Sequence, residues 1–399
     1  MKRTLLGAAI AAFALGGWSA AHAQEPIRIG VLEDMSGVYA DITGANSVAG
    51  AQLAVEDFGG TVLGRPIEIV SADHQNKADV GASIARKWYD VDGVEMITGL
   101  GNSSVALAVR GISTEKGKVN ISTSAGTNAL TGEACSETGF HWVYNTYALS
   151  KTIAKSVVES GADKMFIVAA DYTFGHALAD DARKFTEEAG GEVVGQVNAP
   201  LSTADYSSFI LQAQSSGAQT IGLALAGGDL VNFIKQASEF GVTEQGQAMA
   251  GFIIFVNDIK ALGLDAAQGL YLAETFYWDE TDETRAMGKR YEDKTGEMPN
   301  GMQAGVYGSV LHYLKAVEAA GTTEGAAVAA KMKELPVEDF YTKGAKVRAD
   351  GRVMRDFSLY QVKAPGDSEG EWDMLTKIGT LADGEAFQTL EEGGCALVQ

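Results

Sequence analysis

The chain has 399 residues, and its 52 Asp and Glu outnumber 31 Lys and Arg to give a formal net charge of −21. With 46% hydrophobic residues it has the composition of a globular protein, and its length predicts two or three domains. The acidic balance excludes nucleic acid as a partner, because a protein that neutralises phosphates needs a basic face.

The first 23 residues have the order of a secretory signal peptide. Lys2 and Arg3 precede an apolar run over residues 5–15, and Ala21-His22-Ala23 follows as a cleavage motif. The run is too short to span a bilayer, and no later segment has the roughly 18 uncharged apolar residues that a membrane helix needs. We therefore expect export with cleavage after Ala23. Cleavage leaves a net charge of −23, since the segment carries two basic and no acidic residues.

Cys135 and Cys395 are the two cysteines of the chain. In an exported protein a lone pair of cysteines favours a disulfide over two free thiols, so we expect a bond that ties the last residues to the segment near residue 131. Two distant cysteines, and histidines without ligand spacing, do not predict a metal site. Neither a dinucleotide fingerprint nor a P-loop is present. We expect no metal and no cofactor.

Strands and helices alternate strictly in the first part of the chain. Apolar and β-branched runs predict strands at residues 27–32, 68–72, 94–99 and 119–122, and apolar residues at helical spacing predict helices at 44–58, 80–89 and 103–116. Because parallel neighbours need crossover connections, this alternation predicts a parallel sheet with helices on both faces.

The same pattern restarts near residue 164. The predicted strands are 164–170, 192–197, 220–225 and 249–255, and the predicted helices are 175–189, 209–216 and 229–240. In both halves the loop after the first strand carries an aromatic residue and a glycine: Tyr39 and Gly44, then Tyr172, Phe174 and Gly175. The sequence therefore predicts two similar α/β lobes.

Short connectors must carry the chain between the lobes, because no Pro- or Ser-rich linker separates them. We expect crossings near residues 144–150 and 270–278. Helices at 283–295 and 302–320 follow, and then a hairpin with strands at 357–362 and 374–379 around a polar turn. Several crossings predict a hinge and a cleft.

Candidate ligand contacts follow the predicted strands, since open parallel sheets bind ligands beyond the carboxyl ends of their strands. Asn102 and Ser103 open the helix at 103–116, where free N–H groups favour an anion, but spacing alone favours a plain helix cap. Ser124, Ala125 and Thr127 follow the next strand, and Thr127 also suits a turn cap. Two neighbouring hydroxyl-rich strand ends favour a carboxylate site.

Aromatic residues accumulate at the start of the second lobe. Tyr172 and Phe174 either stack on a flat ligand or pack within the lobe, and residues 276–278 either line the cleft or form a strand between the lobes. His141, His176 and His312 stand alone, which is typical of core or surface histidines. No G-x-S-x-G motif and no Ser, His and Asp grouping indicates an enzyme.

Together, the signal peptide, the opening Ile27-Arg28-Ile29-Gly30-Val31-Leu32 with Ser36-Gly37, the paired serines after Gly101, the turn at 124–128 and the segment from Tyr172 to Gly175 resemble one family. The chain is similar to the periplasmic solute-binding proteins of ABC transporters, of the leucine/isoleucine/valine-binding type, over essentially the whole mature chain. The resemblance implies an α/β fold of two Rossmann-like lobes with parallel sheets joined by a three-crossover hinge. It implies a monomer in the periplasm that delivers its ligand to a membrane permease and ATPase.

The resemblance also implies the bounds of the lobes. The N-terminal lobe is expected to comprise residues 24–146 and 276–348, and the C-terminal lobe residues 147–275 and 349–382. The tail at 383–399 is then held back by the Cys135–Cys395 bond.

In that family a serine at the start of the third helix and the following turn hold the ligand carboxylate, which by position implies Ser103, Ala125 and Thr127. The second-lobe aromatic before glycine corresponds to Phe174. The complete predicted site consists of Tyr39, Asn102, Ser103, Ser124, Ala125, Thr127, Tyr172, Phe174 and Phe255. Amino-acid binders also place an acid at the end of the strand that here covers 251–255. That stretch has no carboxylate, and the nearest, Asp258, is displaced.

The missing acid bears on the ligand, because a buried ammonium without a counter-charge costs several kcal/mol. We therefore predict a small carboxylate with an aromatic or other apolar body, such as a benzoate- or phenylpropanoid-like acid, and the chain resembles the branch of the family associated with aromatic acids. The alternatives are a branched-chain amino acid or amide, and a ligand-sensing receptor module. The excess carboxylates are expected on the surface rather than in the cleft.

Overall fold

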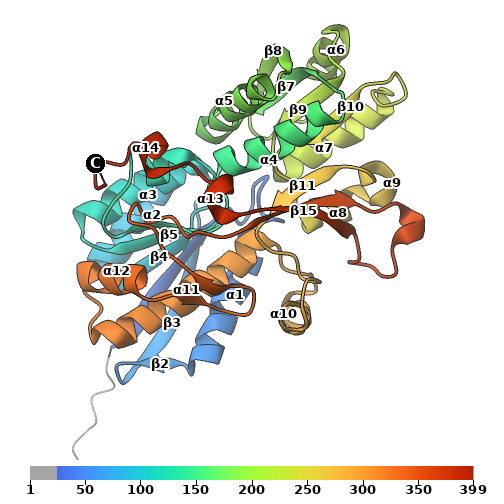
Figure 1. Cartoon of the computed structure of the whole chain (residues 1–399). Coiled ribbons are helices and arrows are strands. Elements are labelled where there is room, and N and C mark those ends of the chain that lie inside the picture. The colour runs from blue at the N-terminus through green and yellow to red at the C-terminus, as the bar shows by residue number, and fades with distance from the viewer. Residues whose placement is uncertain (1–24, 399) are drawn as a thin grey trace, which may run out of the picture.

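The computed structural model describes residues 25–398, and its elements form two groups around parallel sheets (Figure 1). The predicted signal peptide and its cleavage site after Ala23 lie outside the described residues. Among residues 25–398, no helix combines the length and the apolar character needed to cross a membrane.

The first sheet has six strands in the order β2-β3-β1-β4-β5-β6. They are β1 (Ile27–Glu33), β2 (Thr61–Val62), β3 (Arg65–Asp73), β4 (Val94–Gly99), β5 (Val119–Ser122) and β6 (Gly139–His141). All neighbours pair in parallel except β2 with β3, as predicted from the alternation of elements. Leu32 pairs with Gly99, and Gly99 with Ser122, so these strands end level at one edge of the sheet.

Helices cover both faces of this sheet. They are α1 (Gly44–Phe58), α2 (Ala78–Lys87), α3 (Ser103–Glu115), α11 (Gly301–Ala320) and α12 (Gly325–Glu334), while α10 (Asp282–Thr295) packs on α1. The long α11 is buried over most of its length and packs against α1 and α12. Helices α1 and α11 cross closely at Gly50 of α1, where an added Cβ would lie 2.7 Å from the carbonyl oxygen of Gln303 in α11. The small residues of α1 therefore let α11, which comes late in the chain, pack closely on it in the first sheet group.

The second sheet has four parallel strands in the order β10-β9-β7-β8. They are β7 (Lys164–Ala170), β8 (Glu192–Ala199), β9 (Thr220–Ala224) and β10 (Ala248–Gly251). The accompanying helices are α4 (Thr146–Glu159), α5 (Thr173–Glu188), α6 (Ser207–Ser215), α7 (Gly227–Glu239), α8 (Val256–Leu262) and α9 (Leu264–Ala267). The two parallel sheets confirm the predicted α/β fold.

A third, antiparallel sheet lies between the two groups (Figure 1). It consists of β11 (Tyr271–Glu274), β14 (Phe357–Val362) and β15 (Leu375–Leu381), so the predicted C-terminal hairpin is confirmed. The short strands β12 (Val337–Glu338) and β13 (Lys343–Ala345) form a separate pair.

Two of the predicted segments have a different structure. The strand expected at 249–255 ends at Gly251, and the apolar run that follows is a buried bend before α8. The segment expected as a short connector near 144–150 opens the 14-residue helix α4, which packs on α5. A buried bend and a buried strand have the same apolar composition, so periodicity alone does not separate them.

The predicted disulfide joins Cys135 and Cys395, whose Cα atoms are 5.7 Å apart. The tail before Cys395 contains α13 (Asp383–Ala386), which packs on α4, and α14 (Leu390–Gly393), which lies on the short 3₁₀ turn η2 (Asn128–Thr131). Lys151 of α4 donates to the carbonyl of Glu385 at 2.7 Å. The tail therefore contacts elements of both sheet groups.

Candidate ligand-binding site

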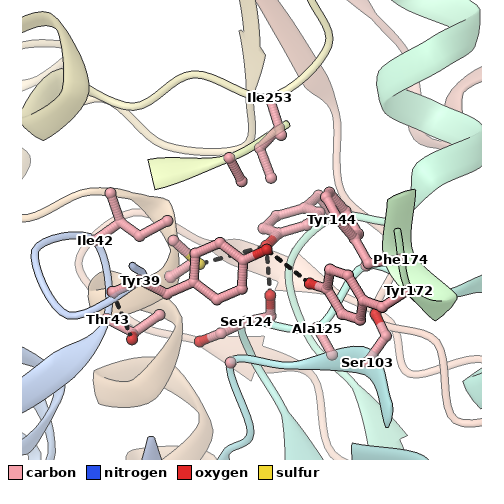
Figure 2. A pocket seen from close by; sticks show the side chains of 14 residues that line it. Tyr39, Ile42, Thr43, Ser103, Ser124, Ala125, Tyr144, Tyr172, Phe174 and Ile253 are labelled. Carbon is pink, nitrogen blue, oxygen red and sulfur yellow. Dashed lines mark hydrogen bonds between the residues drawn. The ribbon is translucent and has the colours of Figure 1, made fainter. Parts of the chain in front are cut away.

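A pocket lies where the carboxyl ends of strands from both parallel sheets meet (Figure 2). Loops after β1, β4, β5 and β6 approach it from the first group, and loops after β7, β9 and β10 from the second. Its lining consists of Tyr39, Ile42, Thr43, Gly101, Ser103, Ser124, Ala125, Gly126, Tyr144, Tyr172, Phe174, Ala226, Ile253 and Met302. This is the position at which open α/β sheets bind ligands.

Two tyrosines close the pocket between the sheet groups. The hydroxyls of Tyr39 and Tyr172 are 2.9 Å apart (Figure 2). The Ser104 and Thr173 hydroxyls form a second contact at 2.9 Å. These two contacts join the sheet groups beside the pocket.

Aromatic rings form one wall of the pocket. The ring centroids of Phe174 and Tyr172 are 6.1 Å apart. The Phe174 ring also packs against Gly126, where an added Cβ would come within 2.9 Å of the ring. Tyr144 donates its hydroxyl to the carbonyl of Ser124 and packs on Phe255 behind it, with centroids 6.0 Å apart. The glycine at 126 thus lets a second-lobe ring lie directly on a first-lobe turn.

The N-terminus of α3 supplies polar groups. The Asn102 side chain caps the helix by accepting from the N–H groups of Ser104 and Val105, at 2.9 and 3.2 Å. The buried hydroxyl of Ser103 accepts from the N–H of Thr127 at 3.3 Å, which ties the helix start to the turn after β5. No hydrogen bond among residues 25–398 engages the N–H groups of Ala125 and Gly126. These two N–H groups and the proton of the Ser103 hydroxyl are donors for an anionic group, and the dipole of α3 favours negative charge there.

Directly behind these donors lies a carboxyl group, that of Glu33 at the end of β1. It is fully buried, and its oxygens accept from the Gly101 N–H at 2.7 Å and from the Ser124 hydroxyl at 2.9 Å. Burial raises the pKa of Glu33 to about 8, against the opposing effect of these hydrogen bonds. The expectation that the carboxylates lie on the surface is therefore wrong at this position.

The pocket lining itself carries no charged side chain. Burial raises the pKa of Tyr39, and the neighbouring Tyr172 adds to that effect. Burial likewise raises the pKa of Tyr172 and Tyr144. The three hydroxyls are therefore neutral at neutral pH, and the pocket combines an apolar body with a polar end.

Six of the nine predicted site residues line this pocket: Tyr39, Ser103, Ser124, Ala125, Tyr172 and Phe174. The other three residues lie nearby and take part in local hydrogen bonds with backbone N–H groups. Asn102 caps α3, Thr127 accepts from the N–H of Ala129 at 3.4 Å, and Phe255 precedes α8 with its N–H donating to Asp258 at 2.9 Å.

Several residues that line the pocket were not predicted from the sequence, notably Ile42, Tyr144, Ile253 and Met302. Ile253 lines the pocket in place of Phe255 because β10 ends early and the chain bends. Tyr144 follows β6, so its place after a strand end was the signal that could have identified it. Met302 lies at the start of a helix far along the chain, and nothing local marks it.

Comparisons with known proteins agree with this geometry. A family model described as periplasmic binding protein matches residues 26–370. The chain is 29% identical over 223 residues to Leu/Ile/Val-binding protein homolog 6 of Brucella abortus, a match that covers 55% of each protein. The chain thus spans about half the length of the curated relatives it matches.

Solved structures match over nearly the whole chain. A periplasmic binding protein from Burkholderia mallei is 44% identical with a TM-score of 0.92, covering 94% of this chain and 100% of that one. A branched chain amino acid ABC transporter periplasmic ligand-binding protein from Burkholderia xenovorans is 40% identical with a TM-score of 0.82 and the same coverage. A Rhodopseudomonas palustris solute-binding protein in complex with benzoate, at 20% identity, has a TM-score of 0.82 over 93% of this chain and 100% of that one. This last likeness is one of fold.

The matched family is one of binding proteins and not of enzymes, in keeping with the sequence analysis. The chain therefore belongs to the periplasmic binding proteins of ABC transporters, in the Leu/Ile/Val-binding family.

Proposed function

We propose that this protein closes its lobes on a small carboxylate with an aromatic or other apolar body and delivers it to an ABC importer. The observation that carries the proposal is the uncharged lining of the pocket. It combines the rings of Tyr39, Tyr144, Tyr172 and Phe174 with the donors at the start of α3.

The absence of charge in the lining disfavours a zwitterion. An amino acid brings an ammonium group, and a buried ammonium without a counter-charge costs several kcal/mol. The position that carries the acid in amino-acid binders corresponds here to an apolar bend, from which Ile253 faces the pocket. A carboxylate with an apolar body leaves no such group unpaired.

The ligand carboxylate is assigned to the polar end of the pocket. We propose that the Ser103 hydroxyl and the N–H groups of Ala125 and Gly126 hold it, while Tyr172 and Phe174 stack on the ring. Asn102 and Thr127, which were predicted to touch the ligand, position these donors instead. The net charge of the protein opposes an anion only weakly, because salt screens diffuse charge over about 8 Å while the donors act in direct contact. The affinity should accordingly change little with salt.

A branched-chain amino acid is the second candidate. The name of the 40% identical protein from Burkholderia xenovorans favours it. So does the Glu33 carboxyl, a negative charge when ionised, behind Gly101 and Ser124. A ligand-sensing receptor module would share the same pocket.

We further propose the lobe bounds given above, a three-crossover hinge, a monomer, export to the periplasm with cleavage after Ala23, and docking to a permease and ATPase. Packing of α10, α11 and α12 with the first sheet group, and of α4 with α5, supports the bounds. The Cys135–Cys395 disulfide supports an oxidising compartment.

A thermal-shift panel tests the ligand class. Benzoate and 4-hydroxycinnamate should raise the melting temperature of the mature protein, and leucine should not. Ligand extracted from purified protein should be recovered unchanged, as expected of a binding protein. Stabilisation by leucine alone would overturn the proposed ligand class in favour of the second candidate.

A further inference from the structure

We infer that Glu33 carries a proton when the carboxylate ligand is bound, so that a site in which Glu33 is ionised takes up one proton together with its ligand. The inference rests on the proposed function, because it requires an anionic ligand at the start of α3. It assigns Glu33 as a residue that sets the charge preference of the site without touching the ligand.

The position of Glu33 is the first observation. Its Oε2 accepts from the Gly101 N–H at 2.7 Å and its Oε1 from the Ser124 hydroxyl at 2.9 Å, and both of these residues line the pocket. The Ser47 hydroxyl of α1 approaches Oε1 at 3.4 Å. An added Cβ on Gly101 would lie 2.6 Å from Oε2, so the backbone lies directly on the carboxyl. One residue separates this carboxyl from the pocket.

The second observation is the charge around Glu33. Among residues 25–398 no Lys, Arg or His forms an ion pair with it. Asp34, directly after β1, adds negative charge, while Tyr144 on the loop after β6 is neutral because burial raises its pKa. His74 follows β3 and donates its N–H to the Glu33 carbonyl, and burial lowers the pKa of its ring to about 4. The groups of α1, of the loop before α3 and of the turn after β5 that touch Glu33 are uncharged.

A ligand carboxylate beside Gly101 and Ser124 adds a further negative charge to this environment. Two carboxylates in one buried site do not both ionise, so an anionic ligand favours protonated Glu33. Protonation also reverses a hydrogen bond. With a proton on Oε1, Glu33 donates to the Ser124 oxygen, and the Ser124 hydroxyl becomes free to donate to the ligand. The site thus gains a donor when it loses a charge.

Calorimetry of the mature protein with benzoate tests the inference directly. Titrations cover about pH 6 to about pH 9, and above about pH 8 each is run in borate and in Tris, whose ionisation enthalpies differ, so that protons taken up are counted. We expect a constant Kd at low pH and a rise that approaches about tenfold per pH unit above about pH 8, with close to one proton taken up per ligand there.

Two variants separate Glu33 from other buried acids. Glu33→Gln keeps an acceptor for the Gly101 N–H and a donor for Ser124, so it should bind benzoate with a Kd that stays flat across this range. Asp258→Asn removes another buried carboxyl, the one that caps the start of α8, and should keep the wild-type rise. The wild-type proton count decides the matter if Glu33→Gln does not fold.

The outcomes are distinct. Benzoate binding with a pH-independent Kd and no proton uptake overturns the inference and leaves the proposed function standing. No benzoate binding at any pH overturns the proposed ligand class, and the inference falls with it. Leucine binding that tightens as pH rises also overturns the inference, because Glu33 would then act as an ionised counter-charge.

Discussion

At the residue scale, the ring of Phe174 can be tested against a control on the same helix. Phe174 lines the pocket, whereas Phe185, also on α5, packs edge-on against Tyr147 with centroids 4.8 Å apart. We expect Phe174→Ala to raise the Kd for benzoate about tenfold or more, because a buried phenylalanine ring contributes about 1.5–3 kcal/mol. Phe185→Ala should lower the melting temperature and leave the Kd within about twofold. Equal Kd values for the two variants would contradict the stacking role.

Glu33 should also shape the stability of the protein without ligand. Its pKa rises from 4.5 to about 8 on folding, so the native state binds more protons than the unfolded state between these values. The free energy of unfolding should therefore fall with rising pH above about 4.5, by at most about 1.4 kcal/mol per pH unit from this group, and the loss should be complete beyond about pH 8.

Urea unfolding of the wild type and of Glu33→Gln at about pH 5.5, 7 and 8.5 measures this difference. The variant should gain stability relative to the wild type as pH rises. A difference that stays constant with pH would show that Glu33 titrates normally in the folded protein.

The site was predictable from sequence where side chains follow strand ends, as Ser103, Ser124 and Tyr172 do. It was not predictable where the role of a residue depends on contacts with segments that are distant in the sequence. Glu33 ends a strand whose apolar run suggested only core, and its partners at 101 and 124 come from other strands. When tertiary contacts bury a side chain such as that of Glu33, the sequence around it shows no pattern that indicates the burial.

At the element scale, the start of α3 distinguishes a capping role from a ligand contact. Asn102 accepts from two N–H groups of the first turn and does not line the pocket. We expect Asn102→Ala to lower the free energy of unfolding by about 1 kcal/mol, while Asn102→Ser retains most of the cap.

Benzoate titrations of both variants complete this test. The Asn102→Ser variant should bind with a Kd within about threefold of the wild type, since a serine cap preserves the helix terminus. A large loss of affinity in Asn102→Ser with unchanged stability would assign Asn102 to the ligand.

The elements themselves were predicted well where periodicity was unambiguous, as in α1 and β7. The segment after Gly251 is uniformly apolar and buried, and such a composition predicts a strand as readily as a bend. Helix α4 differs from the predicted connector, although Asn145 caps it and Ile153, Ala154 and Val157 are buried along it. A capping residue followed by apolar residues at helical spacing is the sequence signal for this helix.

At the scale of the whole molecule, the Cys135–Cys395 bond closes residues 135–395 into one covalent loop. Replacing both cysteines by serine should lower the free energy of unfolding by about 2–4 kcal/mol, as measured by urea unfolding. Thiol titration of the unfolded, unreduced wild type should detect no free thiol. Two reactive thiols would contradict the bond.

Alternation of strands and helices was sufficient to predict two parallel-sheet lobes, because crossover connections leave few other arrangements. The sequence did not predict how tightly the lobes meet. That closeness depends on the Tyr39–Tyr172 and Ser104–Thr173 contacts, which join residues far apart in the chain.

The most direct test of the account compares leucine with 4-methylpentanoate by calorimetry. The two ligands share a carboxylate and a branched apolar body, and they differ in the ammonium group alone. The uncharged lining of the pocket predicts that 4-methylpentanoate binds at least about 100-fold more tightly, which corresponds to about 2.7 kcal/mol for the unpaired ammonium. Tighter binding of leucine than of 4-methylpentanoate would contradict the central claim that the site selects a carboxylate without an ammonium.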